Sequence, residues 1–138
     1  MIVLDSCAAV EMVRKSPDGM ALRWFITKNE RVISCELFRA EAASVFRKLT
    51  RVDGLSPDEA ESHFNEAIAL VDEFYPIEEL QSEALRESIR LGHSTYDMFY
   101  FVLARRTGAT LFTLDRTLMN LCEQNGVSCL SEVSLASA

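Results

Sequence analysis

Apolar positions along the chain alternate between short continuous runs and longer segments with helical spacing. The short runs predict strands, and the longer segments, which repeat apolar residues every three to four positions, predict helices. The predicted strands are Ile2–Leu4, Arg31–Ser34, Phe74–Ile77, Thr110–Leu114 and Val127–Leu130. The predicted helices are Cys7–Arg14, Pro17–Lys28, Glu36–Thr50, Pro57–Asp72, Glu79–Leu91, Tyr96–Thr107 and Asp115–Gln124. This alternation is typical of an α/β fold, in which helices flank a mainly parallel sheet.

Local signals mark several of the predicted helix ends. Ser16 and Ser56 each precede a proline at the first helical position, and Ser56 with Glu59 has the spacing of a capping box. Gly92 and Gly108 follow helical segments, where glycine commonly terminates a helix. The boundaries therefore agree with the periodicity.

Composition indicates a globular protein. The chain has 138 residues, 49% of them hydrophobic and 25% charged, which is enough for a buried core. Because no linker or repeat divides it, we expect residues 1–138 to form a single domain. No apolar run could span a bilayer, and the first residues lack a basic segment and a cleavage site, so we expect a cytoplasmic protein without a secretory signal. The cysteines at 7, 35, 122 and 129 lack zinc-finger spacing and are expected to be buried free thiols.

The net charge of −7 changes the functional picture. A chain this acidic has no broad electrostatic attraction for nucleic acid. Two options are left: the protein binds divalent cations, or it offers an acidic face to a basic partner.

Two acidic residues end predicted strands. Asp5 follows the first apolar run, and Asp115 follows Thr110–Leu114. Both should lie at the carboxyl edge of a parallel sheet, where such sheets bind ligands. Both could instead be helix N-caps, because Asp favours that position.

Two further acids fall on helix faces expected to be buried. Glu41 shares a helical row with apolar Leu37 and Val45, where a charge needs a cation, a hydrogen-bonding partner or an altered pKa. Pairing with Arg39 or Arg47 is the alternative. Asp97 opens a segment that is apolar on nearly every face.

A capping box with Ser94 is a second role open to Asp97. If the four acids converge, their mutual repulsion requires a cation. Ligation by oxygen alone suits Mg²⁺ or Mn²⁺, and ions of this kind can activate water and polarise a phosphoryl oxygen. The sequence thus favours phosphodiester chemistry, although spacing alone does not establish convergence.

These segments, taken in order over almost the whole chain, resemble the PIN domain, and most closely the VapC-like toxins of bacterial toxin–antitoxin systems. Four segments carry the resemblance, each with one of the acids: Ile2–Ser6, Phe38–Arg47, Tyr96–Ala104 and Leu111–Arg116.

The resemblance implies a PIN-like three-layer sandwich with a mainly parallel sheet of four to five strands. It also implies a Mg²⁺- or Mn²⁺-dependent endoribonuclease that leaves 5′-phosphate and 3′-hydroxyl ends. By this resemblance, the acids that form the metal cluster are Asp5, Glu41, Asp97 and Asp115, supported by Ser6 or Thr113. The implied partners are an RNA substrate, a second copy of the chain in a homodimer, and a cognate antitoxin protein.

Other functional classes fit the sequence less well. A catalytically weak PIN-fold module that acts by binding antitoxin or RNA remains an alternative. A nuclease acting on DNA flaps would need larger helical insertions, and a haloacid-dehalogenase-like phosphatase would need an Asp where Cys7 stands. His63 and His93 are expected in surface or capping roles.

Local basic residues are candidates for phosphate contacts, with an ordinary solvated helix face as the alternative. The candidates are Arg39, Arg47, Lys48, Arg51 and Arg116.

Overall fold

The computed structural model describes residues 1–26 and 29–130 and is built around a parallel β-sheet. The described strands are β1 (Ile2–Leu4), β2 (Val32–Cys35), β3 (Glu73–Tyr75) and β4 (Thr110–Phe112). They lie in the order β3-β2-β1-β4, with Val3 paired to Ile33 and to Leu111. Every residue of β1 and β2 is buried, which explains why their sequences do not alternate between apolar and polar positions.

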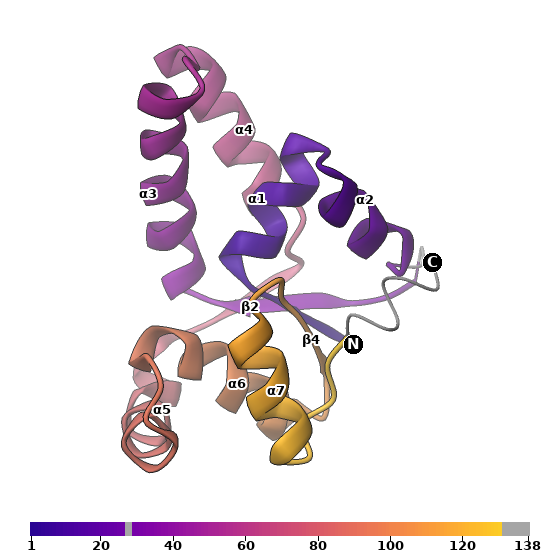
Figure 1. Cartoon of the computed structure of the whole chain (residues 1–138), viewed down its shortest axis with the longest axis vertical. Coiled ribbons are helices and arrows are strands. Elements are labelled where there is room, and N and C mark those ends of the chain that lie inside the picture. The colour runs from indigo at the N-terminus through magenta and orange to yellow at the C-terminus, as the bar shows by residue number, and fades with distance from the viewer. Residues whose placement is uncertain (27–28, 131–138) are drawn as a thin grey trace.

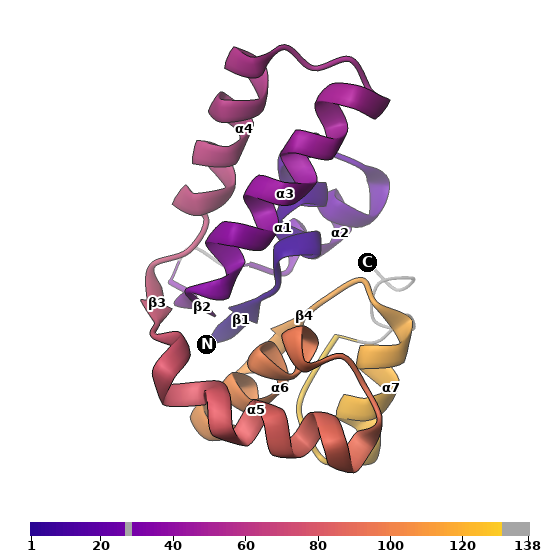
Figure 2. The same cartoon turned by 90° about the vertical axis from the view of Figure 1, so that its left-hand side faces the viewer.

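Helices cover both faces of the sheet (Figure 1 and Figure 2). One face carries α1 (Ser6–Arg14), α2 (Pro17–Trp24), α3 (Leu37–Val52) and α4 (Pro57–Ala69). The opposite face carries α5 (Ile77–Leu91), α6 (Thr95–Thr107) and α7 (Arg116–Gln124). The predicted α/β sandwich is confirmed. Among the described residues, no helix combines the length and apolarity needed to cross a membrane.

Helix α6 is the central helix of its layer. It contacts β1, β2 and β4, and all seven residues of Met98–Ala104 are buried. This burial confirms the prediction that a segment apolar on nearly every side runs through the interior. The first turn of the same helix carries Asp97, so the core packing of α6 fixes the position of that acid.

The path of the chain changes sides between β1 and β4. Strands β1, β2 and β3 are joined through α1–α4 on one face, and β4 is reached through α5 and α6 on the other. The helices that follow β1 and β4, namely α1 and α7, therefore diverge to opposite faces of the sheet. In open parallel sheets, the crevice at the carboxyl edge beside such a reversal is where ligands bind.

The helix boundaries follow the local signals in the sequence. The Ser16 side chain accepts the Gly19 N–H, and Ser56 forms the complete capping box with Glu59. Gly92 ends α5 in the left-handed conformation, at a φ of 62°, which glycine adopts without a Cβ clash.

The segment predicted as a fifth strand, Val127–Leu130, is not a strand in the described part of the chain. It forms an isolated parallel bridge between Leu111 and Cys129. Leu111 donates its N–H to Ser128 and accepts the N–H of Leu130, so the pairing is limited to one residue of β4.

Several other predicted elements are shorter than expected. Strand β4 ends at Phe112 rather than Leu114, and helix α4 ends at Ala69 rather than Asp72. Strand β3 ends at Tyr75 because Pro76 has no N–H to donate, and Ile77 already belongs to α5. Helix α2 ends at Trp24, and Lys28, the predicted end, lies outside the described residues.

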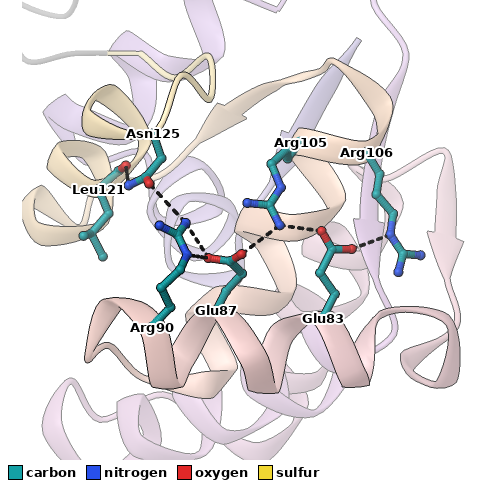
Figure 3. Close-up of polar contacts among 7 residues, drawn as sticks. All are labelled: Glu83, Glu87, Arg90, Arg105, Arg106, Leu121 and Asn125. Atoms are coloured by element: carbon teal, nitrogen blue, oxygen red, sulfur yellow. Dashed lines mark hydrogen bonds and ion pairs between the residues drawn. The ribbon is translucent and has the colours of Figure 1, made fainter.

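Charged side chains connect α5 to α6 and α7 (Figure 3). The ion pairs are Arg105–Glu83 at 2.5 Å, Arg106–Glu83 at 2.7 Å, Arg105–Glu87 at 3.1 Å and Arg90–Glu87 at 2.6 Å. Arg90 also donates to Asn125 of α7. Partly exposed pairs of this kind each contribute about 1 kcal/mol or less. Together they give both Glu83 and Glu87 an arginine partner.

Candidate metal centre

Asp5 lies directly after β1, at the carboxyl edge of the sheet. Its side chain accepts the Ala8 N–H at 2.8 Å and thereby caps α1. The residue is nevertheless only 5% exposed. Asp5 therefore has the capping role that the sequence left open, and its carboxylate lies inside the fold.

The environment of Asp5 disfavours its negative charge. Burial raises the pKa of Asp5 from 3.8 to about 7, and the charges of Asp97 and Glu41 push in the same direction. Hydrogen bonding by Thr113 and by the Ala8 N–H opposes this rise. The raised pKa of Asp5 thus reflects burial first, with smaller contributions from the carboxylates of Asp97 on α6 and Glu41 on α3.

Glu41 projects from α3 toward α6. Its Oε1 accepts the Tyr100 hydroxyl at 2.5 Å and the Ser6 hydroxyl at 3.3 Å. Burial raises the pKa of Glu41, the two hydroxyls oppose the rise, and Asp97 adds to it. Two hydroxyl donors therefore hold one oxygen of this carboxylate.

The arginine alternative for Glu41 is wrong. Arg39 forms its ion pair with Glu36 at 2.7 Å and lies over the Phe74 ring. Arg47 forms no ion pair with any residue that the structure describes.

Asp97, His93 and Asp115 form a compact group. His93 Nε2 lies 2.8 Å from Asp97 Oδ2, and one ligand atom from each of the three residues lies within 4.8 Å of the others. Ser94 makes no side-chain cap hydrogen bond, so the capping box is not the role of Asp97. Asp115 caps α7 by accepting the Leu118 N–H at 3.1 Å, and its side chain is exposed.

Two buried hydroxyls lie among these acids. Thr113 is fully buried; its Oγ accepts the Asp115 N–H at 3.1 Å, and its hydroxyl interacts with Asp5. It therefore links the two acids that end strands. Ser6 is 4% exposed and donates to Glu41.

Asp97 belongs to both groups of acids. It affects the pKa of Asp5 and of Glu41, and it shares the compact group with Asp115. Arg116 aside, no lysine or arginine within residues 1–26 and 29–130 forms an ion pair with any of these four acids.

Sequence reasoning missed two residues of this region. His93 was expected at the surface or in a cap, but its side chain is 14% exposed and lies against Asp97. The available signal was its position one helical turn before that acid. Tyr100 was counted with the apolar core of α6, and its contact with Glu41 could not be inferred from periodicity.

The residues present fit a divalent cation. Burial and neighbouring carboxylates raise the pKa of Asp5 and of Glu41, and a cation beside them would stabilise their charged forms. Their oxygens are the ligands that Mg²⁺ and Mn²⁺ prefer, and His93 restrains Asp97 as outer partners of metal ligands do.

Comparisons with known proteins agree with this geometry. Residues 2–123 match the PIN domain, and the chain belongs to that family. PIN domains are generally metal-dependent nucleases that act on RNA.

A solved structure, "Crystal structure of PAE2754 from Pyrobaculum aerophilum", has a similar fold. The TM-score is 0.69 at 21% sequence identity, and the match covers 99% of this chain and 97% of that one. No curated protein matches the chain.

Proposed function

We propose that this protein is a metal-dependent endoribonuclease whose catalytic acids and metal ligands are Asp5, Glu41, Asp97 and Asp115. One observation carries the proposal: beside the sheet reversal, Asp97 influences the pKa of Asp5 and of Glu41 and shares a compact group with His93 and Asp115.

The surrounding residues hold the acids in place. The Tyr100 and Ser6 hydroxyls fix one oxygen of Glu41, and Thr113 restrains the strand ends that carry Asp5 and Asp115. His93 orients Asp97. Because these partners are buried or partly buried, the carboxylates are preorganised.

When bound, Mg²⁺ or Mn²⁺ supplies an activated water and neutralises charge that develops on the phosphoryl group. Asp115 is exposed, whereas Asp5 is buried, so the candidate centre reaches the surface at Asp115. The expected products carry 5′-phosphate and 3′-hydroxyl ends.

The test is Mg²⁺-dependent cleavage of RNA by the purified protein. Asp97→Asn should reduce cleavage by on the order of 10²-fold or more while the fold is kept. Asp58→Asn is a matched control, because Asp58 is an exposed acid of α4. Full activity of Asp97→Asn would refute the assignment, and RNA binding without cleavage by the wild type would favour the binding-module alternative.

Metal binding can be tested before any substrate is known. Mg²⁺ or Mn²⁺ should raise the melting temperature, because a ligand that binds the native state stabilises it. The double variant Asp5→Asn/Asp115→Asn should lose most of this increase. An equal increase in both proteins would show that the ion binds elsewhere.

As the finer part of the proposal, the protein is a VapC-like toxin: a cytoplasmic, single-domain homodimer silenced by a cognate antitoxin. The net charge of −7 supports a basic antitoxin segment as partner. Co-purification with the product of the adjacent reading frame, and loss of cleavage in that complex, tests this part.

A further inference from the structure

Most lysines and arginines of the described chain fall into two groups. Six arginines form ion pairs with carboxylates: Arg14, Arg31, Arg39, Arg90, Arg105 and Arg106. Six other basic residues form none within the described chain: Lys15, Arg23, Arg47, Lys48, Arg51 and Arg86. Three of those six, Arg47, Lys48 and Arg51, are adjacent on α3, and all three are exposed.

These cations line an open groove of about 550 Å³ along α3. The residues that line it, called the α3 groove here, are Ser44, Val45, Arg47, Lys48, Arg51 and Val52. The core side of the helix, with Phe38, Ala42 and Phe46, is buried and keeps the groove residues turned outward.

The α3 groove continues the helix face that carries Glu41. Val45, Lys48 and Val52 stand four, seven and eleven residues after Glu41, so all four share one side of the helix. At 1.5 Å per residue, Lys48 lies roughly 10 Å along the helix axis from Glu41. The groove therefore leads directly away from the candidate metal centre.

Helix stability does not explain this cluster. Arg47 and Arg51 are like charges at a spacing of four residues, which destabilises a helix slightly. Arg51 lies in the last turn, where the helix dipole favours a cation, but that effect does not extend to Arg47 and Lys48.

The charge of the whole protein strengthens the argument. With a net charge of −7, the protein repels polyanions unless local cations offset that charge. Contacts between phosphates and basic side chains supply most of the sequence-independent affinity for nucleic acid. Unpaired cations beside the candidate site are suited to that role, whereas paired arginines would first have to break an ion pair.

We propose that the α3 groove binds the phosphate backbone of the RNA substrate next to the bond that is cut. This inference rests on the proposed nuclease function and adds the surface by which an acidic protein holds a polyanion. The groove guides one strand toward Glu41, with Arg47, Lys48 and Arg51 contacting successive phosphates.

The experiment compares two triple variants of equal net charge. The test variant is Arg47→Gln/Lys48→Gln/Arg51→Gln, and the control is Lys15→Gln/Arg23→Gln/Arg86→Gln. Each removes two arginines and one lysine that are exposed and unpaired in the described structure. Binding of a fluorescein-labelled single-stranded oligoribonucleotide is measured in EDTA, so that cleavage does not interfere, at several salt concentrations.

The test variant should bind at least about tenfold more weakly than the wild type. A plot of log affinity against log salt concentration should have a slope smaller in magnitude by about 2, because each phosphate contact of a single strand contributes about 0.7 to that slope. The control should bind like the wild type. Melting temperatures check the fold, and the single variant Lys48→Gln provides a milder test, with a smaller loss in the same direction.

Other outcomes overturn the proposal. Equal losses in both triple variants would show a general charge effect, and no loss in the test variant would show that the groove is unused. A changed oligomeric state with unchanged RNA affinity would show that a second copy of the chain covers the groove. Cleavage by the wild type with unaltered RNA affinity of the test variant would leave the nuclease function standing without this surface. Groove-dependent binding without cleavage would support the surface and refute the nuclease.

Discussion

The two ends of α6 carry charge in opposite ways. At the C-terminal end, Arg105 and Arg106 meet Glu83 and Glu87 of α5, so each carboxylate has an arginine partner (Figure 3). At the N-terminal end, Asp97 lies beside Asp115 and contributes to the raised pKa of Asp5 and of Glu41. The nearest partner of Asp97 is the imidazole of His93.

The difference separates charge used for structure from charge reserved for a ligand. Arginines of the chain pair with Glu83 and Glu87 of α5, which keeps the pKa of both carboxyl groups below the usual value despite partial burial. Burial and mutual repulsion keep the pKa of Asp5 and of Glu41 above the usual value. Of these two sets of acids beside α6, the uncompensated one is where an external cation would be stabilised.

The largest contrast should be in catalysis. Glu41→Gln removes a negative charge but keeps an oxygen for the Tyr100 and Ser6 hydroxyls, and cleavage should fall by on the order of 10²-fold or more. Glu83→Gln makes the same chemical change in the α5 row and should leave cleavage within about twofold, because it lies outside the candidate centre. Single-turnover cleavage rates measure both; similar rates would remove the distinction between the two ends.

A smaller catalytic effect is expected at His93. His93→Ala should lower cleavage by about 10- to 100-fold, as loss of an outer partner of a metal ligand does. His93→Gln places an amide nitrogen near the position of Nε2 and should recover most of the rate. Failure of Gln to do better than Ala would argue against an orienting role through Asp97.

Next in size is an effect on stability. The folded-state pKa of Asp5 is raised from 3.8 to about 7, so the folded protein binds this proton more tightly than the unfolded chain. Stability therefore falls as the pH rises between those values. Asp5→Asn should stabilise the metal-free protein by on the order of 2 kcal/mol at pH 8 and by much less near pH 4. Urea unfolding in EDTA measures this; a destabilised variant at pH 8 would contradict it.

The smallest effect is a change in stability at Glu83, and its sign is opposite to that expected at Asp5. Although burial alone would raise the pKa of Glu83, hydrogen bonds from Arg105 and Arg106 bring it below 4.5. The associated stability is present at neutral pH and is lost as the pH falls through the folded pKa. Glu83→Gln should therefore destabilise the protein by about 0.5 kcal/mol at pH 7 and by less in acid, since the pairs are partly exposed. A stabilised variant at pH 7 would reverse the comparison.

Sequence periodicity was sufficient for the layers of the fold and for the approximate location of the acids. The parallel sheet follows from continuous apolar runs such as Ile2–Leu4, and the buried helix around Asp97 follows from its lack of a polar face. The cap signals at Ser16 and Ser56 predicted helix starts because a cap depends on neighbours within one turn.

Contacts between distant segments could not be predicted in this way. Periodicity shows that Tyr100 is buried but not that its hydroxyl meets Glu41, because that depends on the packing of α6 against α3. The limited pairing of Cys129 with β4 likewise depends on tertiary contacts, which a short apolar run does not encode.

Asp5 and Asp115 each begin a helix as well as lying at the proposed centre. Substitutions that inactivate the protein at these two positions therefore differ in their cost to stability. Replacement by Asn abolishes the charge and still accepts the N–H of the first turn, whereas replacement by Ala also frays the helix by about 1 kcal/mol. Relatives of this chain that have lost the proposed nuclease activity should thus carry Asn at both positions. This residue would distinguish them from active relatives.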